Sequence, residues 1–407
     1  MSARRPALIW LLLLGALALR AGWVVQRWHA QGATLAYPDE ELHWQLARNL
    51  VHSGTLATDD GRYAARMPLY PLFLALFAGL GPTGVLVAKL AQAALGAATA
   101  GAAFGFARRA LGPRAALVAG VLVACDPFGV FFANLLLSET VFTLLLVAFI
   151  WCAWGTCVSG TRRAAIGVAL LGPALILTRP SAVALVPLVW LASAWAARPR
   201  AVGRTAGSLV LNLLVVVLML LPWGLRNRAV LGSSAWLSTN GGVTLYDAQG
   251  PQADGSSNQT FLRELPELQD RDEAELDDTL TRLAWQQMQA EPGRVLRLAG
   301  TKFLRLWNPF PNVAEYRGGA AAWAGAAYTL VVLLVAIAAA VRVLTRHSIG
   351  ADRRRFQLFL WLPILYFTLL HCIYIGSVRY RVPLMPLLCL GAAAVATSPA
   401  PRNVAHD

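Results

Sequence analysis

Long apolar runs separated by short polar segments repeat along the whole chain. Many of these runs approach the roughly 20 residues that a helix needs to cross about 30 Å of hydrocarbon. A single run of this kind would suit a signal peptide, but a series of them would not. The alternation therefore predicts an all-α polytopic membrane protein with about ten membrane-spanning helices.

The polar breaks give the expected bounds of these helices. We predict membrane helices over residues 6–26, 83–107, 114–126, 134–157, 164–178, 181–197, 205–223, 320–341, 356–375 and 383–397. The first run follows Arg4 and Arg5 and resembles a signal peptide, but no cleavage pattern of small residues precedes Trp23. We therefore expect it to be retained as a helix.

The apolar stretch 67–81 is treated differently, because it is short and interrupted by prolines. We expect it to form an interfacial or re-entrant helix. Arginines then settle the topology, since cytoplasmic loops of membrane proteins are enriched in Lys and Arg. With 67–81 outside the membrane, all short basic clusters between the apolar runs fall on one side: Arg108, Arg109, Arg114, Arg162, Arg163, Arg198, Arg200, Arg204, Arg342, Arg346 and Arg353 to Arg355.

This topology divides the chain into three parts. Residues 1–223 form an N-terminal transmembrane module that contains the first external loop, 28–82. Residues 224–318 form an external, mainly helical segment, and residues 319–407 return to the membrane. Of the 21 acidic residues, only Asp352 and Asp407 then lie on the cytoplasmic side, which agrees with the arginine pattern.

Composition supports a membrane protein and argues against a nucleic-acid partner. Of the 407 residues, 57% are hydrophobic and only 14% are charged, against about a quarter charged in an ordinary soluble domain. The net charge of +14 comes from basic loop clusters, and no basic-aromatic surface module is present. The five cysteines lie in or beside apolar runs without metal-site spacing.

Two acidic features are candidates for chemistry. Asp39 and Glu40 follow Pro38, which can open a helix in its first turn. Their charge either complements the helix dipole or places a carboxylate at the membrane surface as a general base or metal ligand. Glu139 lies in an apolar setting near the outer end of a helix. Such a group is a functional candidate, and a paired structural carboxylate is the alternative.

Several arginines fall at outer helix ends, and their shared side is the informative feature: Arg66, Arg179, Arg226, Arg228, Arg379 and Arg381. Singly, each is an ordinary interfacial anchor whose side chain reaches toward the headgroups. Together they can line a cavity that accepts an anion, because guanidinium groups bind phosphate in a bidentate geometry.

At these residues the chain resembles the GT-C superfamily of membrane glycosyltransferases. It is most similar to the family 39-like bacterial branch related to protein mannosyltransferases and lipid A aminoarabinose transferases. The resemblance rests on stretches that occur in the family's order: Pro38-Asp39-Glu40, Ala47-Arg48-Asn49-Leu50, Gly54, Arg66-Met67-Pro68-Leu69-Tyr70-Pro71, Leu137-Ser138-Glu139, Leu177-Thr178-Arg179-Pro180, Pro222-Trp223-Gly224-Leu225-Arg226-Asn227, Ser238-Thr239-Asn240-Gly241-Gly242 and Arg379-Tyr380-Arg381-Val382-Pro383.

The resemblance implies a GT-C-like bundle that transfers a hexosyl or pentosyl group from a polyprenyl-phosphate donor to an extracytoplasmic glycan, lipid or protein, with inversion. It implies a multi-pass protein of the bacterial inner membrane, with a cytoplasmic N-terminus and a site facing the periplasm. Most members of the family carry a further external domain after the last helix; we expect none here, so that 224–318 would be the large acceptor-side element.

The resemblance also assigns roles to individual residues. Asp39 would be the main catalytic carboxylate, with Glu40 as its helper. The donor phosphate would be held by the side chains of Arg66, Arg179 and Arg379. Glu139 would position the acceptor or a metal, and a divalent metal ion would take Asp39 and Glu139 as ligands. No organic cofactor is expected.

A transporter or lipid flippase of envelope glycan synthesis is the alternative function, since it also places ionisable residues in a membrane cavity. The chain lacks an obvious inverted repeat and paired broken helices near mid-membrane, which are typical of transporters. Its polar groups also gather on one side. A non-catalytic assembly partner is the third possibility, which the acidic motif disfavours.

Overall fold

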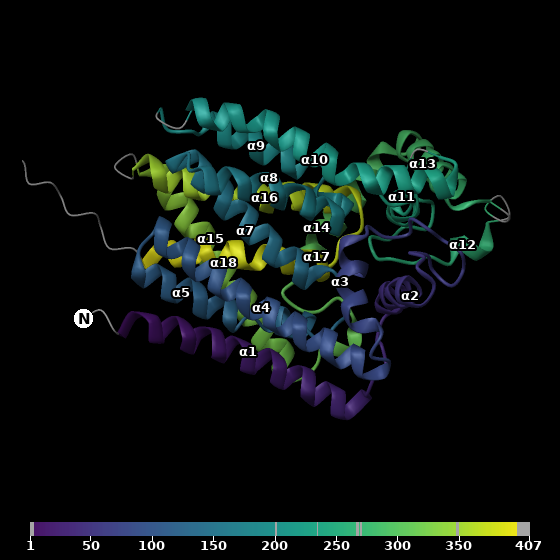
Figure 1. Ribbon diagram of the computed structural model, residues 1–407, viewed down its shortest axis with the longest axis horizontal. Coiled ribbons are helices and arrows are strands. Elements are labelled where there is room, and N and C mark those ends of the chain that lie inside the picture. Colours follow the sequence, from purple (N-terminus) through teal and green to yellow (C-terminus); the bar gives the residue numbers. More distant parts are fainter. Residues whose placement is uncertain are drawn as a thin grey trace, which may run out of the picture.

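The structure is a computed structural model that describes residues 4–199, 202–233, 235–265, 268, 271–346 and 350–396. All regular secondary structure in these ranges is helical (Figure 1). This confirms the predicted all-α class. Arg200, Asp407 and the predicted end of the last helix at residue 397 lie outside the described residues.

Seven helical stretches within the described ranges are long and apolar enough to cross a membrane. They are α1 (Arg4–Gln31), α4 (Pro82–Ala110), α7 (Glu139–Ser159), α10 (Val202–Leu231), α15 (Gly319–Thr345), α16 (Ala351–Ile373) and the nearly continuous α17 (Val378–Arg381), η4 (Val382–Leu384), α18 (Met385–Ala393) and η5 (Ala394–Ala396). The other three predicted spans are shorter helices: α5 (Pro113–Ala124), α8 (Arg162–Thr178) and η1 (Pro180–Ala182) with α9 (Leu185–Trp195).

Two predicted bounds were wrong by several residues, and the first was wrong because proline did not end the helix. α10 continues through Pro222 to Leu231, beyond the predicted end at 223. Conversely, the predicted start at 134 is too early. Asp126 caps the short helix α6 (Pro127–Phe132) by accepting from Phe128 N, and α7 begins only at Glu139.

The first external loop contains two helices that lie across the end of the bundle. α2 (Pro38–Ser53) has Pro38 in its first turn and ends at Gly54, whose φ of 70° is a conformation that suits glycine. α3 (Leu69–Ala78) has only 10 residues, about 15 Å of helix. This is half of a membrane span, in agreement with the prediction for 67–81.

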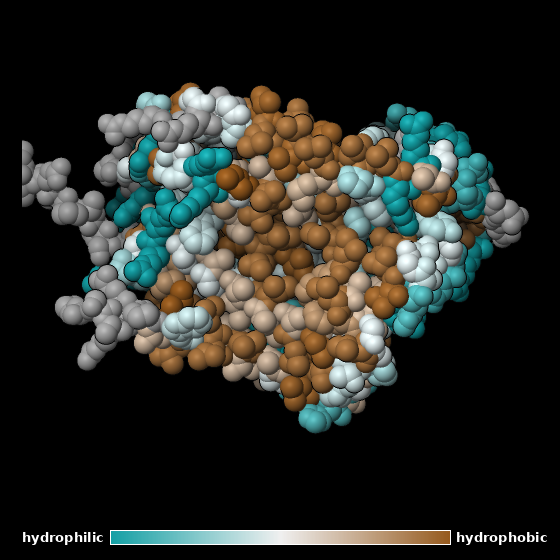
Figure 2. All heavy atoms as spheres, in the orientation of Figure 1, coloured by the Kyte–Doolittle hydropathy of each residue, from teal (hydrophilic) through white to brown (hydrophobic). Residues whose placement is uncertain are grey.

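The surface and the core both suit a membrane environment. Figure 2 shows a broad hydrophobic band across the middle of the molecule, with hydrophilic residues gathered at the two ends. Inside, small residues of α4 such as Ala97, Ala100 and Ala103 are buried and let α1 and α5 approach closely. α18 runs through the centre, and its residues from Met385 to Ala393 are all buried.

The external segment and the first external loop occupy the same end of the bundle. In Figure 1, α11 (Gly241–Gln249), α13 (Glu273–Ala290) and α2 lie at the right-hand end, opposite the N-terminus. The segment also contains α12 (Phe261–Glu264), α14 (Pro292–Leu306) and η3 (Ala314–Tyr316). On the side of the protein with the basic clusters, the loop after α9 contacts the start of α16, since Arg198 Nε donates to Asp352 Oδ1 at 3.0 Å.

Candidate active site

Asp39 lies at the centre of the candidate site, held by two arginines. It occupies the first turn of α2, because Pro38 starts that helix. Arg66 Nη2 donates to Asp39 Oδ1 at 2.7 Å, and Arg379 Nη1 donates to Asp39 Oδ2. The second arginine comes from α17, 340 residues away in sequence. Each carboxylate oxygen therefore has its own guanidinium partner.

Glu139 forms the buried side of the same cluster. It begins α7, and its side chain is fully buried. Arg379 Nε donates to Glu139 Oε1, and Arg179 Nη1 lies 3.4 Å from that oxygen. Glu139 Oε2 has no hydrogen-bond partner within the described part of the chain. Arg379 thus bridges Asp39 and Glu139. The structure brings together five of the six predicted site residues.

The cluster contains three guanidinium groups and two carboxylates, so it has one excess positive charge and attracts anions. Burial alone would raise the pKa of Asp39, but the neighbouring Arg379 and Arg66 outweigh burial and hold that pKa well below its usual range. The side chain of Asp39 is 35% exposed, whereas that of Glu139 is 0% exposed. Only Asp39 of the two is therefore open to an incoming substrate.

Glu40 points to a different place from its neighbour Asp39. Its Oε2 accepts from the backbone N–H groups of Ala36 and Tyr37, at 2.9 and 3.2 Å, and its Oε1 accepts from Leu136 N at 2.7 Å. Burial raises the pKa of this carboxyl group. The geometry supports a positioning role, in which Glu40 fixes the start of α2, more than the predicted role as a helper to Asp39.

Tyr380, which was not among the predicted site residues, supports the arginines. Arg179 Cζ lies 5.3 Å from the centre of the Tyr380 ring and Arg379 Cζ lies 5.9 Å from it. His371 stacks on the ring at 4.1 Å with an interplanar angle of 13°. The tyrosine thus keeps two guanidinium groups close together by cation–π contacts. The only sequence signal was its place between Arg379 and Arg381.

Two other predicted outer arginines have separate tasks. Arg381 is buried and donates to the carbonyls of Leu306 and Asn308. Arg226 donates to the carbonyls of Tyr63 and Leu56. Both guanidinium groups therefore bind backbone, which distinguishes them from the three arginines that contact carboxylates.

The cluster does not suit the predicted metal ion. Among the described residues, no group of three or more His, Cys, Asp or Glu side chains could hold one. The Arg379 guanidinium already bridges the two predicted ligands, Asp39 and Glu139. A divalent cation between these carboxylates would have to displace that positive group. The residues present therefore fit an anion better than a cation.

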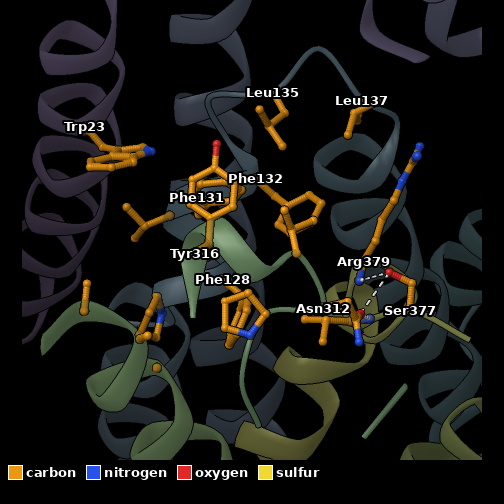
Figure 3. A pocket seen from close by; sticks show the side chains of 18 of the residues that line it. Trp23, Phe128, Phe131, Phe132, Leu135, Leu137, Asn312, Tyr316, Ser377 and Arg379 are labelled. Atoms are coloured by element: carbon orange, nitrogen blue, oxygen red, sulfur yellow. Dashed lines mark hydrogen bonds between the residues drawn. The ribbon is translucent and has the colours of Figure 1, made fainter. Parts of the chain in front are cut away.

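A large apolar cavity lies beside the cluster and has a volume of about 630 Å³. Figure 3 shows aromatic side chains around it, among them Trp23, Phe131 and Tyr316, with Arg379 at one edge. Its walls come from α1, α6 and the start of α15. Asn312, another lining residue, accepts from Val378 N at 2.6 Å and so fixes the start of α17. One cavity thus combines a cationic edge with a long apolar wall.

Comparison with known proteins identifies the fold. No protein-family model matches the chain, and no curated protein matches it in sequence. The structure is similar to the archaeal oligosaccharyltransferase AglB from Archaeoglobus fulgidus in complex with an inhibitory peptide and a dolichol-phosphate, with a TM-score of 0.58 and 14% identity over 96% of this chain. The apo form of the Archaeoglobus oligosaccharyltransferase gives a TM-score of 0.57 and 13% identity over 95% of this chain.

The chain spans half the length of these two proteins, since 50% of each is covered. The Archaeoglobus enzyme was also solved with Zn and sulfate, at a TM-score of 0.51, 13% identity and coverages of 97% and 54%. ArnT from Cupriavidus metallidurans matches at a TM-score of 0.44 and 17% identity, over 96% of this chain and 78% of its own. The chain therefore shares the fold of the archaeal oligosaccharyltransferase over nearly its whole length, and this fold agrees with the all-α membrane bundle predicted above.

Proposed function

We propose that the protein is a membrane glycosyltransferase that transfers a sugar from a polyprenyl-phosphate donor to an acceptor outside the cytoplasm, with inversion. The observation that carries the proposal is the pairing of the Asp39–Arg66–Arg379 cluster with the apolar cavity at its edge. A polyprenyl phosphate has the same two parts, a phosphate and a long apolar chain. The AglB structure with dolichol-phosphate gives this ligand class a precedent in the same fold.

In this proposal Arg66, Arg179 and Arg379 hold the donor phosphate. A guanidinium group can donate two parallel hydrogen bonds to the oxygens of one phosphate. Its fixed positive charge stabilises the phosphate as it becomes a leaving group. Glu139 keeps Arg379 and Arg179 in place, because its buried Oε1 accepts from one and lies 3.4 Å from the other.

Asp39 then acts as the general base. The acceptor hydroxyl gives its proton to Asp39, its oxygen forms a bond to the anomeric carbon, and the bond from that carbon to the phosphate oxygen breaks. The electron pair of that bond leaves with the polyprenyl phosphate. A single displacement of this kind inverts the anomeric configuration. Glu40 contributes by holding the first turn of α2, which carries Asp39.

The bundle is proposed to lie in the bacterial inner membrane with its N-terminus in the cytoplasm, so that the site faces the periplasm. The distribution of arginines supports this orientation. So does the position of α2, α11 and α13 at the end of the bundle opposite the N-terminus.

Transfer is best tested with the purified protein in lipid nanodiscs. We expect it to release polyprenyl phosphate from a radiolabelled polyprenyl-phosphate sugar when a periplasmic envelope extract supplies acceptors, and to move the label to an acceptor. A flippase would instead move the intact lipid between the leaflets of a proteoliposome. Translocation without cleavage of the sugar–phosphate bond would therefore contradict the proposal and favour the transporter.

The same assay tests the metal. Because Arg379 bridges the carboxylates that a metal would need, we expect EDTA to change the transfer rate by less than about twofold, within the spread that salt effects on charged contacts produce. Zn²⁺, Mg²⁺ or Mn²⁺ added to the EDTA-treated protein should not raise the rate. Loss of activity with EDTA and its recovery with one of these ions would show that a metal is required.

The cavity is tested by narrowing it at Gly325, a lining residue on α15 whose added Cβ would lie 3.5 Å from Phe128. Gly325→Trp should raise KM for a long-chain donor at least about tenfold, since about 0.8 kcal/mol is lost for each displaced methylene. A donor with a short prenyl chain should be affected much less. Ala324→Trp is the matched control, because Ala324 is the exposed neighbour on the same helix. Equal effects of both substitutions on both donors would contradict this assignment.

A further inference from the structure

Glu273 belongs to the external segment, yet its carboxylate binds the first external loop. It lies in the first turn of α13, capped by Asp272, whose side chain accepts from Ala274 N and Glu275 N. Glu273 Oε2 accepts from Tyr63 N at 2.5 Å, and its Oε1 accepts from Ala64 N at 2.7 Å. These contacts join residues that are more than 200 positions apart.

The same short stretch of backbone is held from other directions. Thr239 Oγ1 donates to Glu273 Oε1, and Thr239 N donates to Ala64 O at 2.9 Å. Arg226 Nη1 donates to Tyr63 O at 2.6 Å. Peptide groups of this loop therefore have partners on both their N–H and C=O sides, and all of these partners come from residues 226–273.

This stretch leads directly into Arg66. Ala64 and Ala65 are buried, at 0% and 2% exposure, and Arg66 Nη1 donates to Ala65 O at 2.9 Å. The guanidinium that contacts Asp39 is thus attached to backbone that Glu273 fixes two residues earlier. Displacement of this backbone would move Arg66 relative to Asp39 and Arg379.

Only a carboxylate meets the requirements at position 273. The three groups that face it, two backbone N–H groups and the Thr239 hydroxyl, all donate hydrogen bonds. A glutamine has one acceptor oxygen and one NH₂ group, so its NH₂ would face a donor. A buried donor without an acceptor is costly, and the loop would shift to avoid it.

We propose that Glu273 is a positioning residue that sets the place of Arg66 for the donor phosphate. The inference rests on the proposed function and deepens it. It means that the external segment, expected from the sequence to serve the acceptor, also organises the donor side of the site. Contact between the two external elements is then a requirement for donor binding.

The first experiment needs no substrate. Hydrogen–deuterium exchange is measured on the full-length protein in nanodiscs for wild type, Glu273→Gln and Glu275→Gln. Glu275 is exposed on the same turn of α13, so its substitution changes the charge equally. We expect peptides covering Tyr63 and Ala64 to exchange at least about tenfold faster in Glu273→Gln, and at the wild-type rate in Glu275→Gln. Unchanged protection in Glu273→Gln would overturn the proposal, even if sugar transfer proves to be wrong.

The second experiment separates positioning from general stability. Glu273→Gln should raise KM for the donor about tenfold, which corresponds to losing the free energy of a hydrogen bond to a charged group. The KM for the acceptor should stay near that of wild type. In a background of Arg66→Met, Glu273→Gln should have little further effect, because residues that act together are not additive. Full additivity of the two substitutions, or equal loss on both substrates, would show that Glu273 only stabilises the fold.

Discussion

Asp39→Asn is expected to lower the rate of sugar transfer by about 10³-fold, within the range that a general base contributes. The asparagine cannot take the proton of the acceptor hydroxyl, although its side chain keeps the same shape. The donor should still bind, since Arg66, Arg179 and Arg379 remain. The affinity of the variant for the donor should even rise, because the negative charge of Asp39 no longer competes with the phosphate for the Arg66 and Arg379 guanidinium groups. The measurement is kcat and donor Kd in nanodiscs.

Glu41→Gln is the control for this substitution. Glu41 lies two positions further along the same helix, and its side chain is 48% exposed. Its Oε1 lies 3.9 Å from Arg48 Nη2. We expect it to transfer sugar at close to the wild-type rate. A fall in kcat with unchanged or tighter donor binding, confined to Asp39→Asn, is the expected signature. If Asp39→Asn turned over normally, the base would have to be another group.

The pH dependence follows from the same contacts. In the free protein Arg379 and Arg66 hold the pKa of Asp39 well below its usual range, so the carboxylate stays ionised throughout the range of ordinary assays. A bound phosphate neutralises part of this positive charge, so the pKa of Asp39 rises in the donor complex. The acid side of the kcat profile should therefore fall at higher pH than that of kcat/KM for the donor. Profiles with the same acid limb would contradict this coupling.

The linkage between this pKa and stability has a defined sign. A carboxyl group whose pKa is lower in the folded protein stabilises the fold above its unfolded pKa, about 3.9. That stabilisation is lost as pH falls toward the folded pKa. Asp39→Asn should accordingly lower the Tm of the ligand-free protein at neutral pH, and the difference from wild type should shrink on acidification.

Most members of the candidate cluster could be singled out from the sequence because each stood next to a feature with a clear physical meaning. Asp39 followed a helix-starting proline, Glu139 was acidic in an apolar setting, and the arginines stood at helix ends. These features define the side of the membrane, which already limits how far apart the residues can be. That Arg379 contacts both carboxylates depends on α17 meeting α2 and α7, which periodicity alone does not determine.

The features of the structure that the sequence did not predict have equally specific causes. Asp39 and Glu40 are adjacent acids, and only the fold shows that one faces the arginines while the other accepts from Leu136 N. Glu273 was not among the candidate residues, because an acid in the first turn of a helix is common and its backbone partners are remote in sequence. The end of α10 was predicted too early because Pro222 is tolerated inside a helix that neighbours support.

Arg379→Gln is expected to abolish detectable transfer and to destabilise the protein. The substitution removes the partner of both carboxylates and, in the proposed function, a ligand of the donor phosphate. Glu139 would keep only Arg179, 3.4 Å away, while fully buried. Breaking a buried ion pair from one side costs about 3–5 kcal/mol, so the Tm in detergent should fall clearly. Arg379→Lys keeps the charge but loses the planar fork, and should recover stability more than activity.

A second substitution separates the two effects of Arg379. In Arg379→Gln combined with Glu139→Gln, the buried carboxylate and its missing partner are both gone, so most of the lost stability should return. Activity should not return, because the proposed phosphate ligand and the guanidinium partner of Asp39 Oδ2 remain absent. If the double variant regained transfer along with its Tm, Arg379 would be a structural partner of Glu139 and not a ligand of the donor. A stable, inactive double variant with weakened polyprenyl phosphate binding is the result expected if Arg379, which lies between Asp39 and Glu139, holds the donor phosphate as proposed.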